Sequence, residues 1–241
     1  MLQLEELLDS KRYIKNEMEF MSPRALVEPF LDVLAINGEP ITVDYQNEVA
    51  NVNEDDSKNI AYPRFGVKVD FGPTDGLPGY LSTIGMMVAL DIGKPIIKIY
   101  TGQDVQTCMN LCIFNASEIF TQDVLADRTA LLDKLMVYAQ GKEKQAEEYA
   151  KMHERLTTTT LTDSGINDRV GELVRQGRTS IGLNHITTGV KYIDDPKSVY
   201  YANDGCSMYN FYNAMTAAIG DSKDILGKPN KTLALSKILL N

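Results

Sequence analysis

The chain has few of the residues on which common catalytic and structural sites depend. It contains two histidines, His153 and His185, which leave little material for a histidine-based acid or base. Its three cysteines, Cys108, Cys112 and Cys206, are an odd and sparse set that does not suit a disulfide framework. Reduced thiols are usual in the cytoplasm, so we expect a cytoplasmic protein.

Long apolar runs and nucleotide-binding motifs are also missing. No run approaches the roughly 18 apolar residues of a membrane helix, and residues 1 to 8 are acidic where a signal peptide would be basic. Gly93-Lys94 and Gly227-Lys228 are each followed by proline where a P-loop needs serine or threonine. The chain has no G-x-S-x-G and no H-E-x-x-H. We therefore expect no enzymatic activity, no cofactor and no membrane partner.

The chain has enough cysteines and histidines for one zinc site, but a zinc site is not the favoured interpretation. Cys108 and Cys112 lie four residues apart, and the two histidines would complete a Cys2His2 set. Both cysteines also fall in an apolar stripe that predicts a helix over residues 104 to 120, where small core residues are the simpler interpretation. We expect these two thiols to be reduced, helical and free of metal.

The net charge of −9 is concentrated at one end of the chain. Residues 1 to 60 hold 5 Lys and Arg against 13 Asp and Glu, whereas residues 61 to 241 hold 19 against 20. Binding of nucleic acid needs cations that neutralise phosphates, and local basic patches are compatible with this distribution. The acidic quarter could instead repel DNA or bind a basic protein.

Hydrophobic periodicity predicts an α+β fold in a single domain over residues 1 to 241. Residues 1 to 40 form an acidic helical segment, in which Ser22-Pro23 starts the second helix. Residues 41 to 101 form an antiparallel sheet whose first strand is acidic on one face and could lie opposite Arg64 and Lys68. Residues 102 to 241 are mainly helical, with predicted helices at 104 to 120, 122 to 156, 163 to 176, 180 to 189, 207 to 219 and 231 to 240.

Two of the predicted strands combine rings and cations on one face. In residues 62 to 71, alternation places Tyr62, Arg64 and Lys68 opposite an apolar face. In residues 96 to 101, it places Lys98 beside Tyr100. Single-stranded nucleic acid needs cations for its phosphates and rings for its bases, so this face is a candidate nucleic-acid platform. The alternative is a solvated sheet face whose charges pair across strands.

Arg175 and Arg178 form a second candidate contact. They follow a helical stretch, where cations can satisfy the last carbonyls and the helix dipole. A clamp for phosphate is the alternative interpretation.

Two segments resemble a known family. Residues 91 to 110, with the sequence Asp-Ile-Gly-Lys-Pro-Ile-Ile-Lys-Ile-Tyr-Thr-Gly-Gln-Asp-Val-Gln-Thr-Cys-Met-Asn, are similar to the phage- and plasmid-borne proteins catalogued as domain of unknown function 932. Residues 208 to 216, Met-Tyr-Asn-Phe-Tyr-Asn-Ala-Met-Thr, resemble a late helix of that family. The resemblance spans roughly residues 60 to 220, and it implies a bacteriophage origin and a non-enzymatic role close to DNA.

Two hypotheses follow. The first is a phage-encoded accessory protein of DNA metabolism in the host cytoplasm. It would bind single-stranded DNA through Tyr62, Arg64, Lys68, Lys98 and Tyr100, with Arg175 and Arg178 as a second contact. It could also form oligomers and recruit a polymerase or recombination protein. The second is an acidic adaptor or inhibitor of a host factor, with no affinity for DNA.

Overall fold

The structure is a computed structural model. It describes residues 14–15, 18–19, 23–36, 42–50, 62–74, 77–89, 96–105, 114–123, 133, 142–202, 205–222 and 227–240. Side chains are described for most of residues 147–240 and for part of the earlier ranges. All structural statements below refer to these residues.

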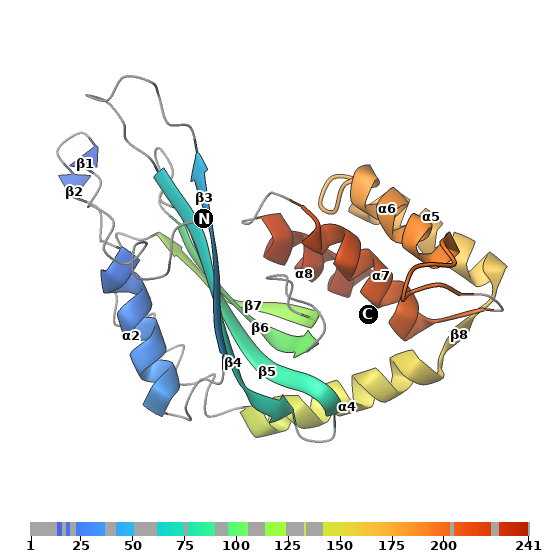
Figure 1. The fold of residues 1–241 in the computed structure, drawn as a ribbon, viewed down its shortest axis with the longest axis horizontal. Helices are drawn as coiled ribbons and strands as arrows, with labels where there is room; N and C mark the ends of the chain where they lie inside the picture. The colour runs from blue at the N-terminus through green and yellow to red at the C-terminus, as the bar shows by residue number, and fades with distance from the viewer. Residues whose placement is uncertain are drawn as a thin grey trace.

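An antiparallel sheet forms the first half of the fold. Its strands follow one another in space as in sequence: β3 (Thr42–Ala50), β4 (Tyr62–Thr74), β5 (Leu77–Ala89), β6 (Ile96–Val105) and β7 (Phe114–Asp123). In the register of β3 with β4, Asp44 lies opposite Lys68 and Glu48 opposite Arg64. The predicted acidic hairpin strand is thus confirmed at the level of the backbone, and so is the α+β class (Figure 1).

The sheet extends further along the chain than the sequence predicted. The expected helix over residues 104 to 120 is wrong where β7 (Phe114–Asp123) pairs with β6 along its open edge. Apolar residues recur there at helical spacing, which is why the sequence predicted a helix. Pairing with β7 satisfies the backbone groups along the edge of β6, and this tertiary contact outweighs the local pattern. Cys108 and Cys112 lie outside the described residues.

The N-terminal segment also departs from the expectation. Two short strands, β1 (Ile14–Lys15) and β2 (Met18–Glu19), pair before Ser22-Pro23, in the part of the N-terminal segment that was predicted to be helical. The second predicted helix is confirmed as α2 (Pro23–Ile36), which begins at the proline that suits a first helical position.

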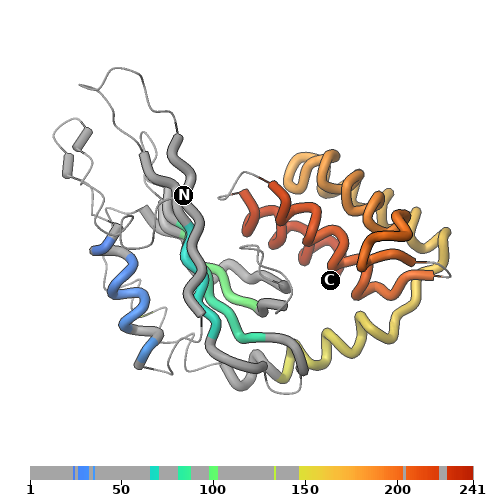
Figure 2. Tube along the Cα trace, in the orientation of Figure 1, coloured from blue at the N-terminus to red at the C-terminus, as the bar shows by residue number. Residues whose placement is uncertain are grey.

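The second half of the chain is helical, and most of residues 147–240 are coloured in Figure 2. It comprises α4 (Lys142–Thr158), α5 (Asp163–Gly177), α6 (Leu183–Asp194), α7 (Met208–Gly220) and α8 (Gly227–Leu239). A small sheet pairs β8 (Thr160–Leu161) with β9 (Cys206–Ser207). No helix among the described residues is long and apolar enough to cross a membrane.

Local signals in the sequence explain where these helices begin. Thr162 accepts a hydrogen bond from the Gly165 backbone N at 3.2 Å and caps α5. Ser207 accepts one from the Asn210 backbone N at 3.1 Å and caps α7, as predicted.

The core of the helical part is built around α7. Phe211 and Tyr212 are fully buried, and Met215 and Ile219 continue the same buried surface. The Tyr212 hydroxyl is hydrogen-bonded to Ser236 Oγ of α8 at 2.7 Å, so this buried phenol is satisfied. The prediction that Tyr212 belongs to the core is confirmed.

Helices flank both faces of the sheet. In Figure 1, α2 lies on one side of the strands, and α7 and α8 lie on the other. One face of the strands is apolar, and its members are buried: Val67, Val69, Ile84, Met86 and Ile99. Val27 and Phe30 of α2 have no exposed surface. The apolar face therefore lies toward α2, and the opposite, polar face lies toward α7 and α8 (Figure 1).

Helices α6 and α7 pack closely because Gly189 has no side chain. A Cβ at this position would contact Met215 Sδ and lie 3.2 Å from the Met215 Cα, which belongs to the backbone and cannot rotate away. We expect Gly189→Ala to lower the free energy of unfolding by about 1–3 kcal/mol through overpacking.

The matched control is Gly171→Ala in α5, where nothing lies within 4 Å of an added Cβ. We expect this change to raise the free energy of unfolding by about 0.5–1 kcal/mol, because alanine favours the helix. Urea denaturation of both variants checks the pair. Equal effects of the two substitutions would contradict the close crossing.

Candidate functional site

Polar side chains from three strands share one face of the sheet. Asp70 of β4 lies opposite Thr83 of β5 in the register. Gly85 of β5 lies opposite both Lys68 and Tyr100. Residues opposite one another in an antiparallel pair project to the same side, so these positions form one surface, here called the polar face: Lys68, Asp70, Thr83, Lys98 and Tyr100. The prediction that Lys68, Lys98 and Tyr100 lie together is confirmed.

The polar face is not a solvent-exposed platform. Lys68 is 1% exposed and Tyr100 is 0% exposed, whereas Lys98 is half-buried. The prediction that this face points to solvent is therefore wrong for Lys68 and Tyr100. For Tyr100 the physical reason is that α8 packs on β7 and reaches across to β6, where Asn230 is hydrogen-bonded to the Tyr100 hydroxyl. A nucleotide base could stack on the Tyr100 ring only if the helices moved away.

Asp70 is the centre of a buried polar group. Its Oδ2 lies 3.8 Å from Lys68 Nζ, and its Oδ1 accepts a hydrogen bond from the Thr83 hydroxyl. Asp70 is 2% exposed and Thr83 is 1% exposed. A buried ion pair contributes little net stability, but removing one partner leaves a buried charge and costs about 3–5 kcal/mol. This group therefore joins the neighbouring strands β4 and β5 on the polar face.

Asn230 of α8 connects the helical part to the polar face. Its Oδ1 accepts hydrogen bonds from the Tyr100 hydroxyl at 2.8 Å and from Lys98 Nζ at 3.0 Å. A carbonyl oxygen has two lone pairs, and these two donors use both. The amide thus joins a fully buried ring to a half-buried ammonium group.

Two of the other predicted contacts, Tyr62 and Arg64, occupy positions on the same side of β4 as Lys68, whereas Arg175 and Arg178 do not lie on the sheet. Tyr62 and Arg64 lie in β4, opposite Ala50 and Glu48 in the register, but their side chains are outside the described residues. Arg175 and Arg178 lie at the C-terminal end of α5, which packs on α6 and α8. Because α8 separates α5 from β7, the two parts of the predicted nucleic-acid surface do not form one site.

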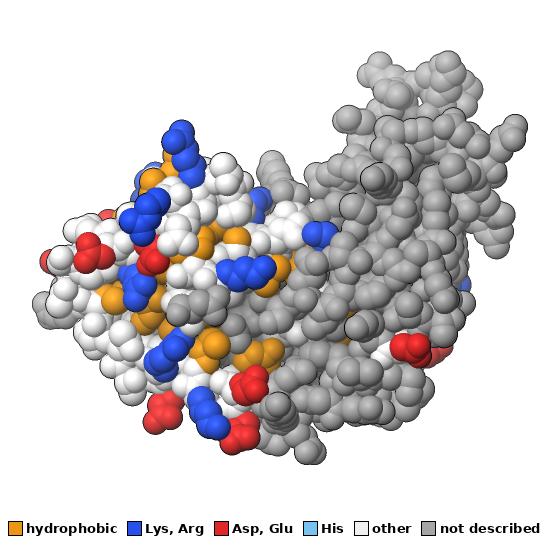
Figure 3. All heavy atoms as spheres, turned by 180° about the vertical axis from the view of Figure 1, so that it is seen from behind, with side chains coloured by type: hydrophobic (Ala, Val, Ile, Leu, Met, Phe, Trp, Pro, Cys, Tyr) orange, Lys and Arg blue, Asp and Glu red, His pale blue; other side chains and the backbone are white. Residues whose placement is uncertain are grey.

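Arg175 and Arg178 lie on the outside of the protein, and both are exposed. Arg175 is in the last turn of α5, and Arg178 is its C-cap with helical backbone angles (φ −51°, ψ −42°). Neither has an ion pair or side-chain hydrogen bond among the residues that the structure describes, so capping of carbonyls by these side chains is not observed. Figure 3 shows Lys and Arg side chains spread among polar and hydrophobic ones over the helical part.

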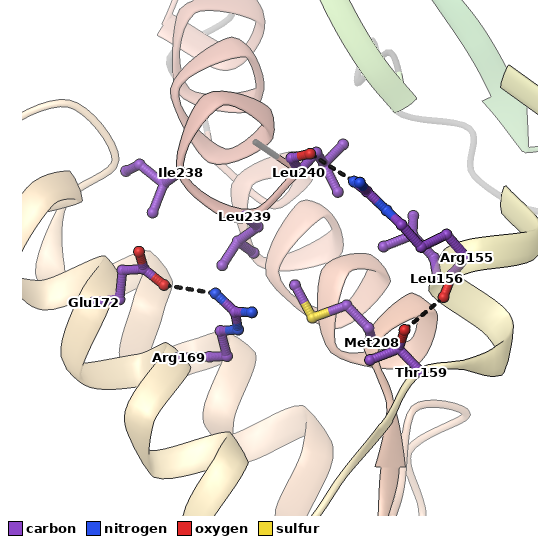
Figure 4. Close-up of a pocket in the computed structure, with 9 residues that line it drawn as sticks. All are labelled: Arg155, Leu156, Thr159, Arg169, Glu172, Met208, Ile238, Leu239 and Leu240. Atoms are coloured by element: carbon purple, nitrogen blue, oxygen red, sulfur yellow. Dashed lines mark hydrogen bonds and ion pairs between the residues drawn. The ribbon is translucent and has the colours of Figure 1, made fainter. Parts of the chain in front are cut away.

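A cavity of about 410 Å³ lies between the C-terminal ends of α4 and α8, the middle of α5 and the start of α7. Arg155 and Arg169 line it together with apolar side chains from α7 and α8 (Figure 4). Sequence reasoning missed this site because Arg155 stands in a highly charged helix, where solvation is the usual interpretation. The only signal in the sequence was that Arg155 and Arg169 are charged, whereas the last residues of the chain are mainly apolar.

The described thiol and phenols do not suit nucleophilic chemistry. Burial raises the pKa of the Cys206 thiol to about 11, so it is protonated at neutral pH. The hydrogen bond to Asp221 raises the pKa of Tyr192 to about 12. Within the described ranges, no three His, Cys, Asp or Glu side chains are grouped as a metal site requires.

Comparison with known proteins gives no assignment. The chain matches no protein-family model, no curated protein and no solved structure. The resemblance to domain of unknown function 932 stays a prediction, and the function has to be argued from the chain itself.

We expect Asn230→Ala to lower the free energy of unfolding by about 1–3 kcal/mol, because it removes two hydrogen bonds worth about 0.5–1.5 kcal/mol each. A double-mutant cycle with Tyr100→Phe isolates the shared bond. In chemical denaturation, the double variant should lose less free energy of unfolding than the sum of the losses in the two single variants.

Asn230→Asp is the matched control, because it keeps the acceptor oxygen next to Lys98. This variant should lower the free energy of unfolding by less than Asn230→Ala does. Strict additivity of Asn230→Ala and Tyr100→Phe would show that the amide does not join the two parts of the fold.

Proposed function

We propose that this chain is a non-enzymatic accessory protein of DNA metabolism that binds single-stranded DNA through its outer helical surface. The observation that carries the proposal is the pair Arg175 and Arg178, which are exposed and uncommitted among the described residues. The polar face of the sheet, which the sequence alone favoured, is an internal contact in this arrangement. The proposal therefore rests on α5, α6 and the segment after α6.

The geometry of the two arginines suits phosphate. Residues three apart on a helix are neighbours on its surface, and the helical angles of Arg178 extend this relation beyond the end of α5. A guanidinium group offers a planar fork of donors that matches phosphate oxygens. Two such groups side by side can contact adjacent phosphates of one strand.

The distribution of charge along the chain favours the helical part over the N-terminal quarter as the surface that meets a polyanion. Residues 142 to 240 carry 13 Lys and Arg against 12 Asp and Glu, whereas the acidic excess lies in residues 1 to 60. The helical part as a whole is therefore close to neutral and does not repel a polyanion. Lys191 and Lys197 are also exposed and add cations at the C-terminal end of α6 and beyond it.

A preference for single strands is supported by the segment that follows α6. Val199 is 86% exposed and Tyr201 is 38% exposed, so this connection presents a ring and an apolar side chain to solvent close to Lys197. Rings next to cations bind unpaired bases by stacking. Duplex DNA keeps its bases inside and would gain only the phosphate contacts. A polymerase or recombination protein is the partner that such an accessory protein would serve.

Replacing Arg175 and Arg178 together by alanine should remove two phosphate contacts. We expect affinity for a labelled single-stranded oligonucleotide to fall, and the slope of log affinity against log salt to flatten by about 0.7 per contact. Fluorescence anisotropy at several salt concentrations measures both quantities. Tyr201→Ala should instead weaken binding by about 1–3 kcal/mol with little change in the slope.

The matched control is the double change Arg175→Lys and Arg178→Lys, which keeps both charges and should keep the salt slope. Lys151→Ala on α4 removes a cation elsewhere, since Lys151 pairs with Glu147. If the parent protein shows no affinity for single-stranded DNA at low salt, the proposal fails. The acidic adaptor, which binds a protein and not DNA, is then preferred.

A further inference from the structure

The cavity between α4, α5 and α8 has the size and lining of a small-molecule site. Its volume of about 410 Å³ falls within the range of about 300–1,000 Å³ that is usual for ligand pockets. Apolar side chains, among them Met208, Ile238 and Leu239, form part of its wall, and polar groups make up more than half of the exposed lining. A mixed lining of this kind suits a ligand that combines a hydrocarbon body with a charged end.

The charged groups of the cavity do not cancel. Arg169 pairs with Glu172 through Nη1 and Oε2 at 2.8 Å, so these two charges compensate each other. Arg155 Nη2 donates to the backbone carbonyl oxygen of Leu240 at 2.6 Å, which is a neutral acceptor. Among the described residues Arg155 has no carboxylate partner. The cavity therefore carries a net charge of one cation, located at Arg155.

Arg155 is held in place and still has donors to offer. Figure 4 shows its side chain reaching from α4 toward Leu240, and Arg169 reaching in from α5. A guanidinium group has five N–H donors, and a single hydrogen bond to a carbonyl fixes its position without exhausting them. A carboxylate can accept from the remaining donors in the paired geometry that arginine favours.

We infer that this cavity binds a small carboxylate with a hydrocarbon body, such as a medium-chain fatty acid. The carboxylate pairs with Arg155, and the hydrocarbon lies against Met208, Ile238 and Leu239. A nucleotide fits poorly, because it brings several negative charges to a site with one uncompensated cation. A neutral hydrocarbon would bury apolar surface but leave Arg155 without a counter-charge.

Octanoate is the probe, titrated into the full-length protein by isothermal calorimetry. We expect one site per chain, with octanol binding more weakly because it lacks the charge. Arg155→Gln removes the cation but keeps a donor for the Leu240 carbonyl, and it should weaken octanoate binding about tenfold without changing octanol binding. Thermal denaturation of each variant confirms that it is folded.

Lys151→Gln is the matched control, because it removes a cation of α4 that pairs with Glu147 and does not line the cavity. It should bind octanoate as the parent does. Absence of octanoate binding by the parent overturns the inference. Equal binding of octanoate and octanol, or an equal loss in Lys151→Gln and Arg155→Gln, overturns it as well.

Discussion

The contact between the polar face of the sheet and the C-terminal helices is the constraint on which the rest of the structure depends. Lys68 and Asp70 are both almost fully buried, and charges in the interior have to be paired and hydrogen-bonded. Thr83 supplies a donor to Asp70 from the next strand, and Asn230 supplies an acceptor to Lys98 and Tyr100 from α8. Polar groups of this kind are satisfied in one arrangement and not in shifted ones, so they define how helices and sheet are joined.

Burial of this face determines which surfaces can meet a partner. The Tyr100 ring and the Lys68 ammonium group, which the sequence predicted to contact nucleic acid, are buried inside the fold. Among the described residues the outer side of the helical part is accessible, and α5 contributes to two separate surfaces there. Its Arg169 and Glu172 line the cavity, and its last turn and C-cap present Arg175 and Arg178 to solvent. The two proposals can therefore be tested without interfering with each other.

Local patterns in the sequence predicted several elements whose determining interaction is local. Alternation predicted β4 and β6, Ser207 predicted the start of α7, and the spacing of Tyr212 predicted its burial. The strand β7 could not be predicted in this way, because it forms by pairing with the edge of β6. The spacing of its apolar residues also fits a helix.

The site was predicted less well than the fold, for a related reason. Alternation shows that Lys68 and Tyr100 share a face, but it does not show whether a helix 130 residues later covers that face. Asn230 lies that far from Tyr100 in sequence, and nothing in β6 indicates such a partner. Likewise, the cavity is made by residues from four helices, and no single motif marks it. Long-range packing decides both features.

Chemical labelling of lysines in the native protein tests this account most directly. Lys68 is 1% exposed, whereas the side chain of Lys151 is 72% exposed on α4. A brief pulse of acetic anhydride followed by peptide mass spectrometry should modify Lys151 readily and leave Lys68 unmodified until the protein is unfolded in denaturant. Modification of Lys68 at the rate of Lys151 in the folded protein would show that the polar face is open to solvent, and would contradict the account.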